Sequence, residues 1–200
     1  VKKLRSLNVA NFNTNAVTNM GYMFTNMATL ENLNVNNFNT SAVTNMNNMF
    51  SGMTNLRSLN LSNFDTSNVK DMGGMFHNMK TITELNLSNF DTSNVLGMEA
   101  MFYNMTALKT LDISNFDTSQ VGSAKSIFAT ADGDSLERIY VNNDFNTARL
   151  TSYMDYTNMF TGRNKLRGGN GSYLSNPATA DLTWLRVDRP GVQGYFTRKS

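Results

Sequence analysis

Few residues in this chain have the chemistry of a catalytic site. The 200 residues include one histidine, His77, and no cysteine, which excludes cysteine metal sites and a disulfide framework. His77 stands where equivalent segments carry Thr25, Ser51 and Tyr103, so the pattern does not require an imidazole. The sequence contains no G-x-S-x-G, no H-E-x-x-H and no phosphate-binding glycine loop. We therefore expect neither an enzyme nor a cofactor.

A carboxylate recurs at Asp65, Asp91 and Asp117, where the earlier segments carry Asn13 and Asn39. Carboxylates stacked about 5 Å apart repel by roughly 0.8 kcal/mol per pair even in water. A calcium ion could relieve this repulsion, although the spacing matches no known calcium loop and an exposed aspartate in a turn needs no ion. Whether calcium binds this column is left open.

Basic residues gather toward the C-terminus. Residues 1–137 carry 8 Lys or Arg and 11 Asp or Glu, a net charge of −3, whereas residues 138–200 carry 9 and 4, a net charge of +5. The segment GRNKLR, which contains Arg163, Lys165 and Arg167, could attract anionic partners such as sialylated or sulfated glycans or wall polymers, with salt-sensitive affinity. An ordinary solvated loop is the alternative. Without an aromatic-interleaved basic motif, we expect no nucleic-acid partner.

These candidates recur because the chain repeats itself every 26 residues. Each unit opens with two leucines or their substitutes, continues with asparagine, phenylalanine, threonine and valine columns, and closes with methionines. Twelve of the fourteen methionines occupy repeat positions. A sixth unit starts near residue 136, displaced by two residues by the segment ADGD. The phenylalanine column, which we expect to point inward, is Phe12, Phe38, Phe64, Phe90 and Phe116.

Within a unit the apolar spacing changes from that of a strand to that of a helix. Leu59 and Leu61 are two residues apart, which predicts a short strand. Met72 and Met75 are three apart, which predicts a short helical or 3₁₀ turn, and Asp71 precedes them where a helix N-cap belongs. We therefore predict an α/β solenoid, a right-handed superhelix of the leucine-rich-repeat type with one short parallel strand and one short helical turn per 26-residue repeat.

Stacking of the units must also satisfy their polar columns. The Asn and Thr columns, exemplified by Asn63 and Thr66, should form ladders about 4.8 Å apart. The Asn amides are suited to hold backbone groups at a tight bend. Methionine suits the interior because its flexible thioether fills irregular gaps.

The outward positions of the predicted strands form a small, polar face. Its amides and hydroxyls could hydrogen-bond a glycan, and only its C-terminal edge carries side chains of the kind that dominate protein interfaces. The alternative is that these residues merely solvate the sheet. The candidate binding residues on this face are Asn34, Asn60, Glu84, Asn86, Asp112, Arg138 and Tyr140.

Two regions are expected along the chain. Residues 1–141 should form the repeat array, with five full repeats and a degenerate sixth, and residues 142–200 a non-repeat C-terminal cap that covers its last apolar face. The cap holds the only Trp and both Pro residues. We expect a piece of a longer protein, because the chain starts abruptly with a predicted strand. No apolar run could span a membrane, and any targeting segment would lie outside the piece.

The string L-x-x-L-N-L-S-N-F-D-T-S-N-V-x-x-M-x-x-M-F-x-x-M resembles the repeat of BspA-like leucine-rich-repeat surface proteins, in the MFxxM variant of lactobacilli and mycoplasmas. The resemblance covers residues 1 to about 141. The tail WLRVDRPGVQGYFTRK is similar to segments that close such arrays ahead of mucin-binding-type or wall-anchor regions. The resemblance implies a solenoid on a Gram-positive or related cell surface, with adhesion as the usual proposed role. The family has no shared catalytic residues.

Together these features predict an extracellular, monomeric binding or adhesion module, attached to the cell wall or membrane through regions outside this chain. Its expected partner is a host or microbial surface glycan or protein of mucin or matrix type. Binding would use the strand face or the basic C-terminal region. The alternative is a passive stalk or spacer within a larger surface protein.

Overall fold

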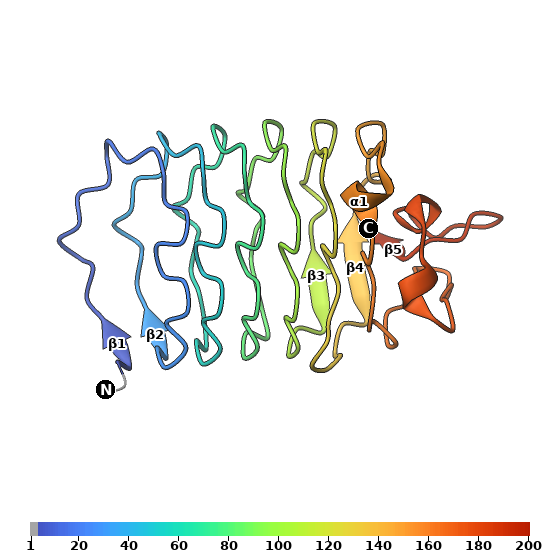
Figure 1. The fold of residues 1–200 in the computed structure, drawn as a ribbon, viewed down its shortest axis with the longest axis horizontal. Helices are drawn as coiled ribbons and strands as arrows, with labels where there is room; N and C mark the ends of the chain where they lie inside the picture. The colour runs from blue at the N-terminus through green and yellow to red at the C-terminus, as the bar shows by residue number, and fades with distance from the viewer. Residues whose placement is uncertain (1–3) are drawn as a thin grey trace.

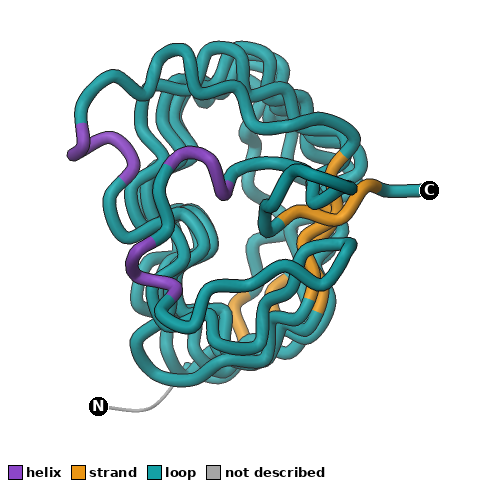
Figure 2. The backbone as a smooth tube through the Cα atoms, turned by 90° about the vertical axis from the view of Figure 1, so that its right-hand side faces the viewer, coloured by secondary structure: helices purple, strands orange, loops and turns teal. Residues whose placement is uncertain are grey.

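The chain winds through successive coils that stack side by side along one axis (Figure 1). The computed structural model describes residues 4–200. Residues 26 apart lie in adjacent coils, as in the parallel pairs Leu7 with Leu33 and Asn45 with Asp71. Seen along the stacking axis, the coils superimpose and the strands lie on one side (Figure 2). We number coils 1 to 6 by residues 4–29, 30–55, 56–81, 82–107, 108–135 and 136–163.

Regular secondary structure is sparse. Strands β1 (Ser6–Leu7) and β2 (Asn32–Leu33) pair in parallel. A second parallel sheet has the order β3 (Thr110–Asp112), β4 (Arg138–Val141) and β5 (Phe196–Arg198). The described helices are α1 (Tyr153–Tyr156) and the 3₁₀ helices Pro177–Thr179 and Leu182–Trp184. No helix in residues 4–200 is long and apolar enough to cross a membrane.

The prediction of one strand per repeat is wrong for coils 3 and 4. Residues 59–61 and 85–87 form no strand, and β1 and β2 pair only with each other. Near this position, a backbone hydrogen bond from Arg57 N to Glu31 O, at 3.3 Å, joins coils 2 and 3. The assignment of the stack to the leucine-rich-repeat class stays a prediction.

Most of the backbone–backbone hydrogen bonds between coils lie in a band of turns, which we call the turn strip: residues 19–26, 45–52, 71–78, 97–104, 123–130 and 155–162. In coil 1, the amides of Met20, Tyr22, Phe24 and Asn26 each donate to a carbonyl of coil 2, at 2.7–2.9 Å. The same four-bond row joins each later pair of coils. The acceptors of the first row are the carbonyls of Asn45, Asn47, Met49 and Ser51.

The predicted helical turn is therefore replaced by consecutive single turns. Met23 N donates to Met20 O and Thr25 N to Tyr22 O, at 3.3 and 3.1 Å. Tyr22 and Asn26 have φ of 62° and 60°, a left-handed conformation that a continuous helix does not allow. Asp71, the predicted helix N-cap, instead caps a single turn: its Oδ1 accepts from the amide two residues ahead, at 2.8 Å.

The predicted interior columns are confirmed from coil 2 to coil 4. Phe38, Phe64 and Phe90 are 2–3% exposed, and Leu, Met and Val columns pack with them in one continuous core. The phenylalanines that follow the second Met stack with ring centroids 5.8–6.2 Å apart. The two ends of the column differ, since Phe12 is 50% exposed and Phe116 is partly buried.

The Asn and Thr columns bond to the backbone of the neighbouring coil rather than to each other. Asn63 Nδ2 donates to the carbonyls of Val35 and Phe38, at 3.1 and 2.8 Å. Thr40 Oγ1 donates to Asp65 O and accepts from Asp65 N, both at 2.8 Å. Thr14, Thr66 and Thr92 bond in the same two ways, so each of these buried Thr side chains joins two coils twice.

Coil-to-coil hydrogen bonding continues past residue 141, where the sequence predicts the end of the repeat array. Ala124 N donates to Asp155 O and Thr130 N to Thr161 O, at 2.7 and 2.8 Å. Residues 155–161 therefore occupy the place of a further strip in coil 6. The remaining residues cover this coil, with Tyr195 against Phe160 at a centroid distance of 4.7 Å.

The close stacking of the strips predicts a position-specific cost for glycine replacement. Gly162 and Gly171 both have positive φ, at 82° and 90°. An added Cβ would lie 2.1 Å from Thr130 O at Gly162 and would meet nothing within 4 Å at Gly171. Gly162→Ala should therefore lower the free energy of unfolding by about 1–3 kcal/mol more than Gly171→Ala, measured by urea titration. Equal losses would contradict the tight strip contact.

Candidate binding surfaces

The outward residues predicted for the strand face are at the surface, but their side chains already serve the backbone. Asn34, Asn60 and Asn86 are exposed and Asp112 is half-buried. In each, the side-chain oxygen accepts from the amide two residues ahead, at 2.9–3.0 Å. This is the Asx turn that favours Asn and Asp at bends. The Asn side chains keep an outward NH₂ group, so the face offers a row of donors.

At the C-terminal side of this face, Asp112 is neutralised by a residue that the sequence does not indicate. Lys199 Nζ lies 2.6 Å from Asp112 Oδ2. Partial burial raises the pKa of Asp112, but hydrogen bonds from Lys199 and Ser114 outweigh it and hold the pKa below its usual value. Tyr140 of β4 lies beside Asp112 in parallel register. Glu84 is exposed and lies in coil 4, so it is not part of this pair.

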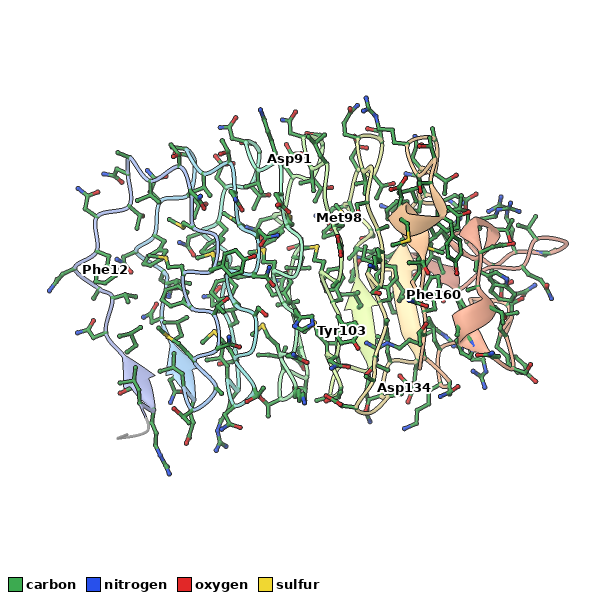
Figure 3. The ribbon with its side chains drawn as sticks, viewed as in Figure 1. Phe12, Asp91, Met98, Tyr103, Asp134 and Phe160 are labelled. Atoms are coloured by element: carbon green, nitrogen blue, oxygen red, sulfur yellow. The ribbon has the colours of Figure 1, made fainter. Side chains whose placement is uncertain are left out.

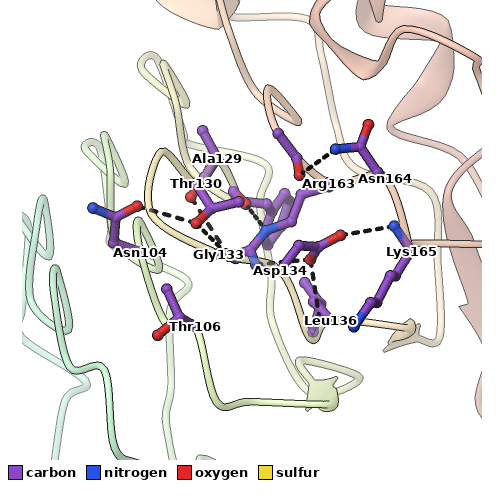
Figure 4. A network of polar contacts seen from close by, with 12 residues as sticks. Asn104, Thr106, Ala129, Thr130, Gly133, Asp134, Leu136, Arg163, Asn164 and Lys165 are labelled. Atoms are coloured by element: carbon purple, nitrogen blue, oxygen red, sulfur yellow. Dashed lines mark hydrogen bonds and ion pairs between the residues drawn. The ribbon is translucent and has the colours of Figure 1, made fainter.

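The prediction that Arg163 binds an external anion is wrong. Its side chain is 1% exposed, and its guanidinium donates to Phe128 O and to Asp134 Oδ1, the latter at 3.2 Å (Figure 4). Burial lowers the pKa of Arg163, and the charge of Asp134 opposes this effect. Arg163 therefore acts inside the protein, where it holds coil 5 to coil 6.

Asp134 organises the ADGD segment around this buried pair. Its Oδ1 also accepts from Leu136 N, at 3.2 Å, and its Oδ2 from Lys165 N, at 2.7 Å. Thr130 Oγ1 donates to Gly133 O at 2.6 Å (Figure 4). The insertion that displaces the sixth repeat thus supplies the counter-charge for Arg163. An ion pair across 29 residues leaves no periodic signal, so sequence reasoning missed it.

Three of the predicted binding residues meet in one hollow, which we call the basic concavity. Arg138, Lys165 and Arg167 line it with Glu137 and Asn164, and its volume is about 440 Å³. Arg138 Nη1 donates to Arg167 O at 3.2 Å. Lys165 is exposed. Two cationic side chains from residues 165–167 therefore lie beside one from β4.

Arg167 is held in place by an aromatic ring and two carbonyls. Its guanidinium carbon lies 4.3 Å from the ring centroid of Tyr173, a cation–π contact. Its Nη1 donates to the carbonyls of Asn164 and Leu166, at 2.8 and 2.9 Å. The charge of this side chain is thus oriented before any ligand arrives.

A larger hollow of about 690 Å³ lies over the turn strips of coils 2 to 5. Lys70, Asp71, His77 and Glu99 line it, and glycines stand at 73, 74 and 97. The sequence analysis did not identify this groove. The signal that could have found it is the replacement of larger residues by glycine at strip positions.

The aspartate column has partners within its own turns. Asp65 Oδ1 accepts from the hydroxyl and amide of Ser67, at 2.6 and 3.0 Å, and Asp91 does the same with Ser93. These hydrogen bonds lower the pKa of both carboxyls. In the described residues, no group of three or more His, Cys, Asp or Glu side chains is placed to hold a metal ion.

One family model matches the chain over most of its length. Residues 1–84 and 76–180 match the family model described as "Mycoplasma protein of unknown function, DUF285". The chain belongs to this family. DUF285 is a bacterial family by this description, and the matched residues include all of the 26-residue repeats. No curated protein and no solved structure matches the chain.

The buried pair predicts a large loss of stability when its carboxylate is removed. Asp134→Ala leaves the Arg163 charge buried without a partner, which should lower the free energy of unfolding by about 3–5 kcal/mol. Glu31→Ala is the control, because its partners Arg5 and Arg57 are 77% and 76% exposed and such pairs contribute at most about 1 kcal/mol. Urea titration measures both. Similar losses would show that the Arg163 pair is not desolvated in solution.

His77 predicts a pH dependence of stability. Burial lowers the pKa of His77 below the usual 6.5, so the unfolded chain binds a proton more readily than the folded one. Its neutral form therefore stabilises the fold above about pH 6.5, and this contribution should decrease as the pH falls. As the pH falls from about 7.5 to about 5.5, the free energy of unfolding of the parent should decrease relative to that of His77→Gln. Parallel pH profiles would contradict the burial effect.

Proposed function

We propose that the protein is a cell-surface binding module of the BspA-like leucine-rich-repeat type, which binds an anionic glycan or glycoprotein at the basic concavity. The observation that carries the proposal is the meeting of Arg138, Lys165 and Arg167 in one hollow. The net charge of +5 over residues 138–200 adds long-range attraction for an anionic partner. The module is extracellular and is attached through regions outside this chain.

The chemistry of the concavity suits a carboxylate or sulfate group. A guanidinium binds such a group with two parallel hydrogen bonds, and Arg167 is already fixed over Tyr173. Lys165 adds an exposed ammonium group. Because Arg138 and Tyr140 are two apart on β4, their side chains lie on the same face of the sheet. A longer glycan would continue from the concavity onto this face and its outward Asn amides.

A stalk or spacer role is the second candidate, and one observation favours it. The side-chain oxygens of Asn34, Asn60 and Asn86 are already bonded to their own turns, which suits a surface that only solvates the stack. A spacer predicts no ligand on broad host-glycan and matrix arrays. It also predicts that deletion of two internal repeats shortens the reach of the parent surface protein and changes nothing else.

An array screen of the isolated chain at two salt concentrations tests the proposal. Binding to sialylated or sulfated glycans should weaken when salt rises from about 0.05 to about 0.3 M, because the screening length shortens. Lys165→Ala should lower the affinity for the best glycan about tenfold, the value of a typical charge-assisted hydrogen bond. Arg149→Ala, an exposed arginine outside the concavity, should not change the affinity.

Two results would contradict the proposal. A blank array at low salt would favour the spacer. Binding that is equal in the parent, Lys165→Ala and Arg149→Ala chains would place the ligand elsewhere, with the strand face and the groove over the turn strips as the remaining surfaces.

A further inference from the structure

Two hydrogen-bond acceptors lie among the cations of the basic concavity. Glu137 and Asn164 line the hollow together with its three basic side chains. Glu137 is exposed, and within residues 4–200 its carboxylate forms no ion pair. The side-chain nitrogen of Asn164 donates to Gly162 O at 3.2 Å, which leaves the side-chain oxygen to accept from a ligand. The concavity therefore offers acceptors as well as positive charge.

Each arginine of the concavity presents one free edge. Arg138 Nη1 donates to Glu137 O and Arg167 O, at 3.1 and 3.2 Å. Arg167 Nη1 donates to the carbonyls of Asn164 and Leu166, at 2.8 and 2.9 Å. In both guanidinium groups, Nε and Nη2 have no hydrogen-bond partner in the described part of the chain. This edge carries two parallel N–H groups, which match the two oxygens of a carboxylate.

The main chain fixes the spacing between the acceptors and the cations. Arg167 N donates to Glu137 O at 3.1 Å, and Lys165 N donates to Asp134 Oδ2 at 2.7 Å. Figure 3 shows Asp134 at the margin of the stack, near the end that the C-terminal residues cover. The segment that carries Lys165 and Arg167 is thus held to coils 5 and 6. A ligand meets an arrangement of charges that is already set, which lowers the ordering cost of binding.

This arrangement disfavours a ligand with many anionic groups. The three cations and the single carboxylate give the concavity a net charge of +2. An anionic group on the arginine edges brings the neighbouring groups of the same ligand close to Glu137. A second anion there would be repelled, because like charges about 5 Å apart repel even in water. Hydroxyl or amide N–H groups in the same place would instead donate to Glu137 and Asn164, and a hydrogen bond to a carboxylate is among the stronger ones.

We propose that the concavity selects a sugar with one carboxylate flanked by hydroxyl or amide N–H donors, as in sialic and uronic acids, and that Glu137 discriminates against densely sulfated chains. This ligand class rests on the proposed function of the concavity and narrows it. Glu137 determines specificity in two ways, because it accepts from the donors of the favoured sugar and repels the additional anions of the other.

Two tetrasaccharides of chondroitin provide a matched test. They share a backbone of alternating uronic acid and N-acetylhexosamine and differ only in their sulfate esters. A basic surface without selectivity would bind the sulfated form more tightly, because sulfation adds negative charge. We expect the parent chain to bind the unsulfated form about tenfold more tightly, measured by isothermal titration calorimetry at about 0.05 M salt.

A third ligand, sialyllactose, separates the two sources of this chemistry. Its carboxylate lies on a terminal sugar, whereas that of chondroitin recurs within the chain. Tighter binding of sialyllactose than of unsulfated chondroitin would identify a terminal sialic acid as the ligand. The reverse order would identify an internal uronic acid, and either order supports the selection of a carboxylated sugar if the sulfated form binds more weakly.

Glu137→Gln removes the charge and keeps the shape and an acceptor oxygen. Its affinity for the sulfated tetrasaccharide should rise about tenfold, so that the two tetrasaccharides bind about equally. Glu99→Gln is the control, because Glu99 is exposed in coil 4 and does not line the concavity. It removes the same charge from the chain and should keep the preference of the parent. This control separates local repulsion from the change in net charge.

The inference and the proposed function fail in different ways. Tighter binding of the sulfated form by the parent, or one common preference in the parent, Glu137→Gln and Glu99→Gln chains, would overturn the inference alone. Binding that Lys165→Ala does not weaken would place the ligand outside the concavity and would overturn both. A lack of binding to all three ligands would also overturn both.

Discussion

Rows of four backbone hydrogen bonds, all running in one direction, join each coil of this protein to the next. They depend on residues held at positive φ, two in each turn strip except that of coil 5, where Ser126 alone adopts it. Glycine and asparagine occupy most of these positions, but Tyr22, Ala100 and Ser126 also adopt φ of 52–62°. The cross-coil bonds offset the conformational cost at the non-glycine positions. The backbone hydrogen bonds thus fix the register of the stack, and this register sets the positions of the side chains.

Register at 26 residues places like side chains on top of each other, which explains the composition of the core. Phe50, Phe76 and Phe102 form a continuous stack of rings, and the methionines fill the space around them. The buried Thr column binds the next coil through both its donor and its acceptor. Many polar residues that look available in the sequence are therefore part of the framework. This leaves the strand face with fewer free groups than its composition suggests.

Charged side chains with defined partners or neighbours gather where the regular stack ends. The ADGD insertion brings Asp134 to Arg163, and residues 164–200 then cover coil 6 with Trp184, Tyr195 and Phe196. The same segment carries Lys165 and Arg167 to the side of Arg138. Irregular loops can hold such groups without disturbing the periodic core. In this DUF285 protein, the cap that closes the hydrophobic stack thus also supplies the most concentrated basic surface.

The sequence alone determined the 26-residue step and the inward columns, because each unit repeats the same apolar spacing and only stacking can bury it. It could not separate a helix from consecutive turns at Met72 and Met75, since both use a spacing of three and the sign of φ depends on bonds to the next coil. Nor could it tell buried Arg163 from exposed Lys165, two residues away. Only the tertiary structure, by bringing Asp134 beside Arg163, decided which charge is internal and which can meet a ligand.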